Sequence, residues 1–178
     1  MWPTFVYGTL MAEEVIQGLI GRVPTMSSPA FLPGYSRWSV VNQVYPGIVK
    51  HDSTSILTDA TVDDIILFNE MTNMPIVEGK LLLGLTPNEM KIFDWFEEVN
   101  IMYKRDVVRV AVDKHWVDAE AYIWLLGDEQ KTSYILDTST KWCYKIFREK
   151  YLHTYLLQTV ASCRKEIQRL KIGTPDLS

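Results

Sequence analysis

A single carboxylate stands out in a helical stretch near the middle of the chain. The stretch is NEMKIFDWFEEV, residues 88–99, and at about 100° per residue Glu97 falls between Met90 and Phe93 on its apolar face. Burial and the negative end of the helix dipole both disfavour the ionised form there, so the pKa of Glu97 should rise. Such a carboxyl can take and return protons near neutral pH, as a general acid and base does.

A structural role for Glu97 is the alternative. An ion pair with Arg105, further along the chain, would brace the end of the helix without any chemistry. The helical pattern is compatible with both roles. They differ in the sign of the pKa shift, because pairing lowers the pKa of a carboxyl and desolvation raises it.

The second feature is a glycine that ends a predicted strand close to the N-terminus. In PTFVYGTLM, residues 3–11, the β-branched and aromatic side chains from Thr4 to Tyr7 favour a strand, and Gly8 breaks it. An ordinary tight turn would explain this glycine. The alternative is a turn whose exposed backbone N–H groups face a ligand, since glycine lets the backbone approach closely.

Other familiar catalytic arrangements are missing from the sequence. His51, His115 and His153 lack the spacing of a metal site built on one element. The sequence contains no G-x-S-x-G, G-x-x-x-x-G-K or G-x-G-x-x-G pattern for a nucleophile, a phosphate or a dinucleotide. Cys143 and Cys163 both fall in a helical pattern that indicates packing, so neither is expected to act as a nucleophile. The sequence therefore predicts a site without a metal or a cofactor.

The composition narrows the class of protein. The chain has 178 residues, 47% of them hydrophobic, and a formal net charge of -4, which fits one domain over residues 1–178. Because the basic residues are scattered, no nucleic-acid partner is expected. No apolar run approaches the roughly 20 residues of a membrane span, and no signal-peptide pattern opens the sequence. The two cysteines are not expected to form a disulfide, so a reducing, cytoplasmic location is predicted.

The elements that must position these residues are a mixture of strands and helices. Helical periodicity covers residues 12–20, and residues 23–49 contain strands joined by Pro-Gly turns. A further strand is predicted at residues 76–85, and two more, at 103–112 and 117–125, form a predicted hairpin. Strands and helices of this kind must share one core, which predicts an α+β domain.

Two helices follow from local signals. Thr86, Pro87 and Glu89 form a capping-box pattern that predicts the start of the helix leading to Glu97. A long C-terminal helix is predicted at residues 139–171, followed by a frayed tail at 173–178. Its apolar stripe consists of Leu152, Leu156, Val160, Cys163, Ile167 and Leu170. The stripe indicates docking on the rest of the domain, with a homodimer seam as the alternative.

A set of motifs connects these features. In chain order they are FVYGTL, LPGYSR, YPGIV, VEGKLLLGLT, DWFE and MYKRDVVRV, and together they cover most of residues 3–125. The ordered set resembles the gamma-glutamylcyclotransferase superfamily, including its gamma-glutamylamine cyclotransferase and plant avirulence-induced-gene branches. This resemblance implies a small mixed β-barrel flanked by helices, with a cavity at one end of the barrel.

The resemblance also implies roles for individual residues. The catalytic glutamate of the family corresponds to Glu97, which would act as the general acid and base. The turn after the first strand would bind substrate through backbone amides that form an anion-binding nest. The substrate-binding residues implied in this way are Tyr7, Gly8, Thr9 and Leu10, with Tyr103 lining the cavity.

The implied activity is the cofactor-free cyclisation of a small γ-glutamyl amide to 5-oxoproline, with release of an amine or an amino acid. A non-catalytic binding module on the same barrel is the alternative, and a different acyl transfer on a glutamyl-like amide is a third option. The chain departs from compact members of the superfamily in two places. Residues 50–75 form a longer excursion, and the C-terminal helix is similar to that of the plant branch, so both bear on which substrate is used.

Overall fold

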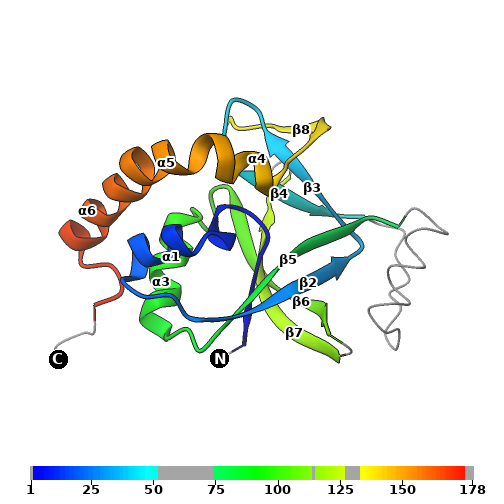
Figure 1. The fold of residues 1–178 in the computed structure, drawn as a ribbon, viewed down its shortest axis with the longest axis horizontal. Coiled ribbons are helices and arrows are strands. Elements are labelled where there is room, and N and C mark those ends of the chain that lie inside the picture. The colour runs from blue at the N-terminus through cyan, green and yellow to red at the C-terminus, as the bar shows by residue number, and fades with distance from the viewer. Residues whose placement is uncertain (1, 52–73, 114, 127–132, 175–178) are drawn as a thin grey trace.

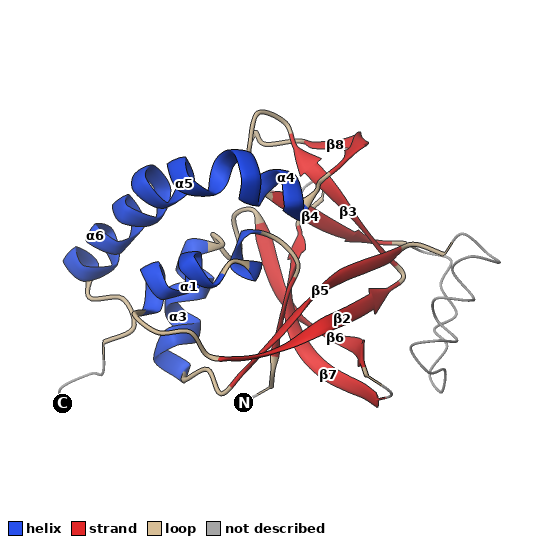
Figure 2. Cartoon of the chain, in the orientation of Figure 1, coloured by secondary structure: helices blue, strands red, loops and turns tan. Residues whose placement is uncertain are grey.

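The core of the fold is a closed five-stranded barrel (Figure 2). The computed structural model describes residues 2–51, 74–113, 115–126 and 133–174. Around the barrel, the strands follow the order β1 (Thr4–Val6), β5 (Ile76–Leu83), β2 (Thr25–Pro33), β6 (Tyr103–Val112) and β7 (His115–Trp124). The barrel is mixed, because β1 pairs parallel to β7 and the other pairs are antiparallel. The predicted α+β class with a small mixed barrel is confirmed.

The predicted hairpin near the middle of the chain is also confirmed. Strands β6 and β7 pair without interruption from Tyr103 opposite Trp124 to Val112 opposite His115. Val108 and Val110 are buried while Arg109 between them is exposed, as expected when alternate side chains point to opposite faces. The hairpin therefore has one face in the core of the barrel and one in solvent.

A second, three-stranded sheet lies beside the barrel (Figure 1). Its order is β4 (Pro46–Lys50), β3 (Tyr35–Val40) and β8 (Leu136–Lys141). The strands predicted within residues 23–49 are thus divided between the two sheets, because the chain changes sheet at Gly34. Gly34 has a φ of 79°, a left-handed conformation that favours glycine over other residues.

The predicted boundary of the C-terminal helix at residue 139 is wrong. Residues 139–141 lie in strand β8, which pairs with β3, and the helix begins at Tyr144. The Asp137 carboxylate accepts hydrogen bonds from the N–H of Ser139 at 3.0 Å and from its hydroxyl. Such local side-chain hydrogen bonds compete with the backbone hydrogen bonds of a helix, and they hold this segment extended.

Two short helices lie at one end of the barrel. Helix α1 (Glu13–Ile20) ends at Gly21, which has a φ of 80°. Helix α3 (Pro87–Phe96) begins with the predicted capping box, in which the Thr86 hydroxyl accepts from the Glu89 N–H at 3.2 Å and Glu89 Oε2 accepts from the Thr86 N–H at 2.7 Å. The start of the helix that leads to Glu97 is therefore confirmed.

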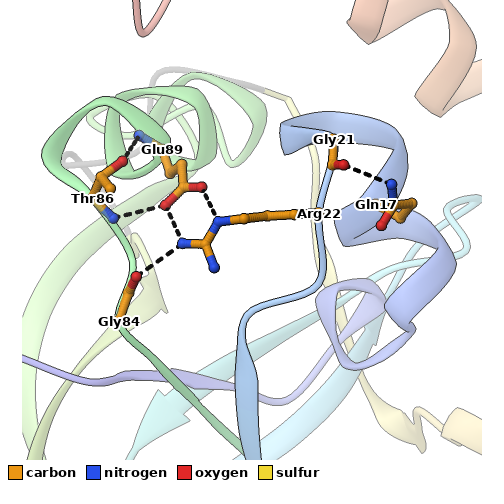
Figure 3. A network of polar contacts seen from close by, with 6 residues as sticks. All are labelled: Gln17, Gly21, Arg22, Gly84, Thr86 and Glu89. Atoms are coloured by element: carbon orange, nitrogen blue, oxygen red, sulfur yellow. Dashed lines mark hydrogen bonds and ion pairs between the residues drawn. The ribbon is translucent and has the colours of Figure 1, made fainter.

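An arginine joins these two helices (Figure 3). Arg22 follows the end of α1, and its Nε and Nη2 donate to the two carboxylate oxygens of Glu89 at 2.6 and 2.7 Å. Nη2 also donates to the Gly84 carbonyl at 2.9 Å. The hydrogen bonds from Arg22 lower the pKa of Glu89, so the carboxylate stays ionised and serves both the cap and the ion pair.

The C-terminal helix arches over α1, away from the barrel strands (Figure 1). It consists of α4 (Tyr144–Ile146), a π-helical segment η3 (Phe147–Tyr151), α5 (Leu152–Tyr155), a second π-helical segment η4 (Leu156–Val160) and α6 (Ala161–Leu170). Leu152, Val160 and Ile167 of the predicted stripe are buried in the core that includes α1. Docking of the stripe on the domain is thus confirmed, and the homodimer seam stays a prediction.

Some predictions fall outside the described part of the chain. Residues 52–73 of the predicted excursion at 50–75 and residues 175–178 of the predicted frayed tail at 173–178 are in this group. Strand β4 ends at Lys50, where the excursion was predicted to begin. Among the helices of the described residues, none is both long and apolar enough to cross a lipid bilayer.

Candidate active site

A cavity lies at the end of the barrel next to helix α3. Its volume is about 300 Å³, including the space at its opening to solvent. The cavity is lined by the turn after β1 with Tyr7, Gly8, Thr9 and Leu10, by Tyr45 and Pro46 at the start of β4, by Glu97, by Tyr103 and Tyr122 of the hairpin, and by Phe5 and Val6. The structure therefore brings all six site residues implied by the sequence to one place.

Glu97 is the residue that ends helix α3. Its N–H donates to the Phe93 carbonyl at 2.8 Å, and its φ and ψ of -84° and 5° leave the helical range there. Although the residue is only half-buried overall, burial of its carboxyl raises the pKa of Glu97 to about 8. The carboxyl is therefore largely protonated at pH 7, and its ionised form is a strong base for a carboxylate.

The structure does not contain the ion pair that was the alternative role for Glu97. Arg105 instead lies with Nε 3.3 Å from Asp94 Oδ1 and with Nη1 3.4 Å from Glu120 Oε2. The raised pKa of Glu97 is also opposite to the lowered pKa that pairing with a cation would produce. The geometry thus favours the desolvated carboxyl over the brace.

The turn after β1 presents unpaired donors to the cavity. Gly8 precedes a 3-10 turn, η1 (Thr9–Met11), in which the N–H groups of Met11 and Ala12 donate to the carbonyls of Gly8 and Thr9 at 3.0 and 3.1 Å. The first N–H groups of such a turn have no partner within it. Across the described ranges, no hydrogen bond is donated by the N–H of Gly8, Thr9 or Leu10. This arrangement is suited to binding an anion.

The reason for glycine at position 8 is more specific than the sequence indicates. A Cβ added to Gly8 would lie 3.0 Å from both Cγ and Cδ of Pro46, which is closer than almost any real contact of a Cβ. Pro46 lines the cavity too. Any larger residue at position 8 must therefore push on Pro46, another part of the cavity wall.

Tyrosines make up much of the cavity wall. The Tyr103 hydroxyl donates to the Pro46 carbonyl at 2.7 Å, and the Tyr7 hydroxyl donates to the Tyr122 carbonyl. The Tyr122 hydroxyl in turn donates to Asp94 Oδ1 at 3.0 Å. Burial raises the pKa of Tyr7, Tyr103 and Tyr122, so all three stay neutral and act as hydrogen-bond donors.

One tyrosine reaches the site from the C-terminal helix. Tyr155 is 7% exposed, and burial raises the pKa of its hydroxyl while a hydrogen bond with the Thr9 side chain lowers it. The charge of Glu97 also raises this pKa, which places Tyr155 within electrostatic reach of the carboxyl. The C-terminal helix therefore supports the turn after β1, which comes from the other end of the chain.

Two cationic side chains for which the sequence predicted no role bind backbone carbonyls of this segment. Arg37 Nη1 donates to the Tyr7 carbonyl at 2.7 Å, and Lys80 Nζ donates to the Met11 carbonyl at 2.9 Å. Arg37 is part of the LPGYSR motif and Lys80 of VEGKLLLGLT, so the motifs contained the signal but gave no role. Neither cation lines the cavity.

The charges around the cavity limit what it can recognise. The described residues that line it include no lysine, arginine or histidine, so a carboxylate or an oxyanion would meet uncharged donors, among them the backbone N–H groups of the turn. Within the described ranges, no three His, Cys, Asp or Glu side chains are placed to hold a metal ion together. The arrangement places one basic carboxyl and one turn with unpaired N–H groups around the same cavity.

Comparison with known proteins identifies the family. The family described as gamma-glutamyl cyclotransferase, AIG2-like, matches residues 4–144. The chain belongs to this family. The relationship inferred from the ordered motifs is thereby confirmed, together with a cyclotransferase-type fold. The match ends at the first residue of α4, so the C-terminal helix and Tyr155 lie outside it.

Relatives of this family member come from Arabidopsis thaliana. AIG2-like protein D is 28% identical over 162 residues, which cover 89% of this chain and 87% of that protein. AIG2-like protein C is 32% identical over 128 residues, which cover 72% of this chain and 62% of that protein. The solution structure of At5g39720.1 aligns with a TM-score of 0.55 at 22% identity over 96% of this chain and 93% of that chain, and shows the shared fold.

Proposed function

We propose that the protein is a gamma-glutamyl cyclotransferase that converts a γ-glutamyl amide into 5-oxoproline and an amine or an amino acid. The observation that carries the proposal is the desolvated Glu97 carboxyl, with a pKa raised to about 8, in one cavity with the unpaired N–H groups of the Gly8 turn. A base and an oxyanion site facing one small space are what an intramolecular acyl transfer needs. Membership of the cyclotransferase family supports the same reaction.

The reaction begins when the α-amine of the substrate attacks its own γ-carbonyl carbon. A new carbon–nitrogen bond closes the five-membered ring, and the ionised Glu97 takes the proton that the attacking nitrogen loses. The carbonyl oxygen becomes an oxyanion, which the N–H groups of Gly8, Thr9 and Leu10 are placed to stabilise. Holding the extended glutamyl chain in a folded shape contributes a large part of the acceleration, because both reacting groups belong to one molecule.

The second half of the reaction returns the proton. The oxyanion collapses, the bond between the γ-carbon and the leaving nitrogen breaks, and protonated Glu97 donates its proton to that nitrogen. Glu97 ends in the form in which it began, so one group serves as base and then as acid. A pKa near 8 suits this double task at neutral pH, because both forms of Glu97 are then accessible.

The test is direct. Purified protein is incubated with γ-glutamyl amino acids, γ-glutamylamines and glutathione, and 5-oxoproline is measured by mass spectrometry. We expect 5-oxoproline from at least one class of substrate, and activity that survives extensive chelation. Binding of the substrates without formation of any 5-oxoproline would instead support the alternative, a non-catalytic small-molecule or protein binding module on the same barrel.

A further inference from the structure

Arg37 makes the contact from which the inference starts. Its Nη1 donates to two backbone carbonyls, that of Tyr7 at 2.7 Å and that of Glu78 at 3.0 Å. Its guanidinium lies over the Trp142 ring with Cζ 5.2 Å from the ring centroid. Arg37 belongs to β3 of the second sheet, so a residue outside the barrel reaches the end of β1. The contact to Trp142 fixes the guanidinium from the other side.

The geometry of the peptide bond links the contact between Arg37 and the Tyr7 carbonyl to the cavity. The Tyr7 carbonyl and the Gly8 N–H belong to one planar, trans peptide unit, so they point in opposite directions. Fixing the carbonyl on Arg37 therefore fixes the Gly8 N–H away from Arg37. Gly8 lines the cavity and Arg37 does not, so the N–H is directed to the cavity side of the turn.

The contact between Arg37 and the Tyr7 carbonyl also strengthens the Gly8 N–H as a hydrogen-bond donor. A cation that binds the carbonyl of a peptide unit draws electron density from its nitrogen, and hydrogen bonds in such a chain strengthen one another. The Gly8 N–H thus becomes a better donor to an anion in the cavity. Because no cation lines the cavity, Arg37 acts on a bound anion through this peptide unit.

We propose that Arg37 is a positioning residue that orients and polarises the Gly8 N–H toward a carboxylate or oxyanion in the cavity. The proposal rests on the proposed function for the identity of that anion, and the contact itself can be tested without any activity. Arg37 does not line the cavity, and we expect its effect on the reaction to pass through the Gly8 amide.

Lys80 provides a matched control. Like Arg37 it is a cation that binds a carbonyl of this segment, that of Met11 at 2.9 Å, and it lies over an aromatic ring, with Nζ 5.9 Å from the centroid of Tyr144. The peptide unit that it holds ends in the Ala12 N–H, which donates to the Thr9 carbonyl. Lys80→Met therefore removes a cation from the back of the turn without altering the peptide unit of Gly8.

The experiment is an amide NMR measurement on the full chain without ligand. In Arg37→Met, the ¹⁵N resonance of Gly8 should move upfield relative to the unmodified protein, because the Tyr7 carbonyl of the same peptide unit loses its hydrogen-bond donor. In Arg37→Lys the Gly8 resonance should move upfield by a smaller amount than in Arg37→Met. In Lys80→Met it should stay where it is in the unmodified protein. A folded Arg37→Met or Arg37→Lys protein whose Gly8 resonance has not moved overturns the proposal, as does an equal movement in Lys80→Met.

A second measurement follows the binding of an anion in the cavity. Adding 5-oxoproline to the unmodified protein should shift the Gly8 amide proton, and it should do so less in Arg37→Lys. With a γ-glutamyl substrate, kcat should fall by about tenfold in Arg37→Lys, less than the roughly hundredfold or greater loss that follows removal of an oxyanion donor. If the proposed function is wrong, the unmodified protein will form no 5-oxoproline from any γ-glutamyl substrate. If this inference is wrong, the Gly8 ¹⁵N resonance will not move when Arg37 is replaced.

Discussion

Arg105 pairs with Asp94, one turn before Glu97 on the same helix, with Nε 3.3 Å from Oδ1. The same oxygen of Asp94 accepts a hydrogen bond from the Tyr122 hydroxyl at 3.0 Å. Asp94 thus braces the end of α3, and among the described residues no cation pairs with Glu97. Burial raises the pKa of Glu97, while Asp94 takes the ion pair with Arg105, and the raised pKa sets the sign of the first prediction.

We predict that Glu97 makes the protein less stable as the pH rises. The pKa of Glu97 is about 8 in the folded protein against an ordinary value of 4.5, so the folded state holds the proton more tightly. The stabilising contribution is complete below pH 4.5 and is lost between pH 4.5 and 8, by at most about 1.4 kcal/mol per pH unit. Urea denaturation at pH 5, 6 and 7 measures this slope, which Glu97→Gln should reduce.

The exposed neighbour Glu98 provides the control for this measurement. Glu98→Gln removes one carboxylate from the same end of α3 without touching the cavity. The stability of Glu97→Gln relative to Glu98→Gln should therefore increase as the pH is raised. A Glu97→Gln protein that is destabilised by the same amount at every pH would show that the carboxylate is paired in the folded state.

The capping box should matter for stability and not for chemistry. Thr86→Ala removes the hydroxyl that accepts from the Glu89 N–H, and loss of such a cap costs about 1 kcal/mol. For a chain of this length the melting temperature should fall by about 2–4 °C. Thr154→Ala is the control, because Thr154 is exposed within the C-terminal helix, where alanine is the better helix former. An equal loss in both variants would contradict the role of the cap.

Local signals made part of this fold predictable from the sequence. The cap at Thr86 and the hairpin of β6 and β7 depend on neighbouring residues and on alternation, and both were found where the sequence placed them. The position of Glu97 on an apolar helix face likewise predicted a desolvated carboxyl. The family motifs added the barrel and the role expected of the turn at Gly8, which periodicity alone does not specify.

The rest depends on contacts between distant segments. Residues 139–141 of strand β8 were predicted as helix because the pairing partner of the strand, β3, lies about a hundred positions earlier in the chain. Arg37 and Tyr155 were missed for the same reason, since their partners Tyr7 and Thr9 come from the first strand and its turn. A sequence indicates which face of an element is buried, but it does not say what that face meets.

Substitutions at Gly8 and Gly18 should separate effects on ligand binding from effects on stability. A Cβ at Gly8 would lie 3.0 Å from Pro46 in the cavity wall, whereas a Cβ at Gly18 would lie 2.4 Å from Cγ1 of Val160 in the C-terminal helix. We expect Gly8→Ala to weaken binding of 5-oxoproline clearly while it changes the melting temperature little. Gly18→Ala should show the reverse, because it disturbs docking of the helix and leaves the cavity walls in place.

Calorimetric titration with 5-oxoproline, run beside a thermal melt, measures both quantities for each glycine variant. Val160→Ala in the Gly18→Ala background removes the atom that the new Cβ would meet, so this pair should recover part of the lost stability. If Gly8→Ala melts far lower yet binds normally once folded, the turn at Gly8 is only structural.

Single-turnover kinetics of Glu97→Gln tests the central claim most directly. Glutamine keeps the shape of the side chain and cannot carry the proton, so 5-oxoproline formation should fall by a factor on the order of 10² to 10⁴, while ligand affinity largely persists. In the unmodified protein, kcat/KM should rise between pH 6 and 8 as Glu97 ionises, and Glu98→Gln should follow the same profile. A folded Glu97→Gln protein that forms 5-oxoproline within a few fold of the unmodified rate would contradict the assignment of Glu97 as the catalytic acid and base.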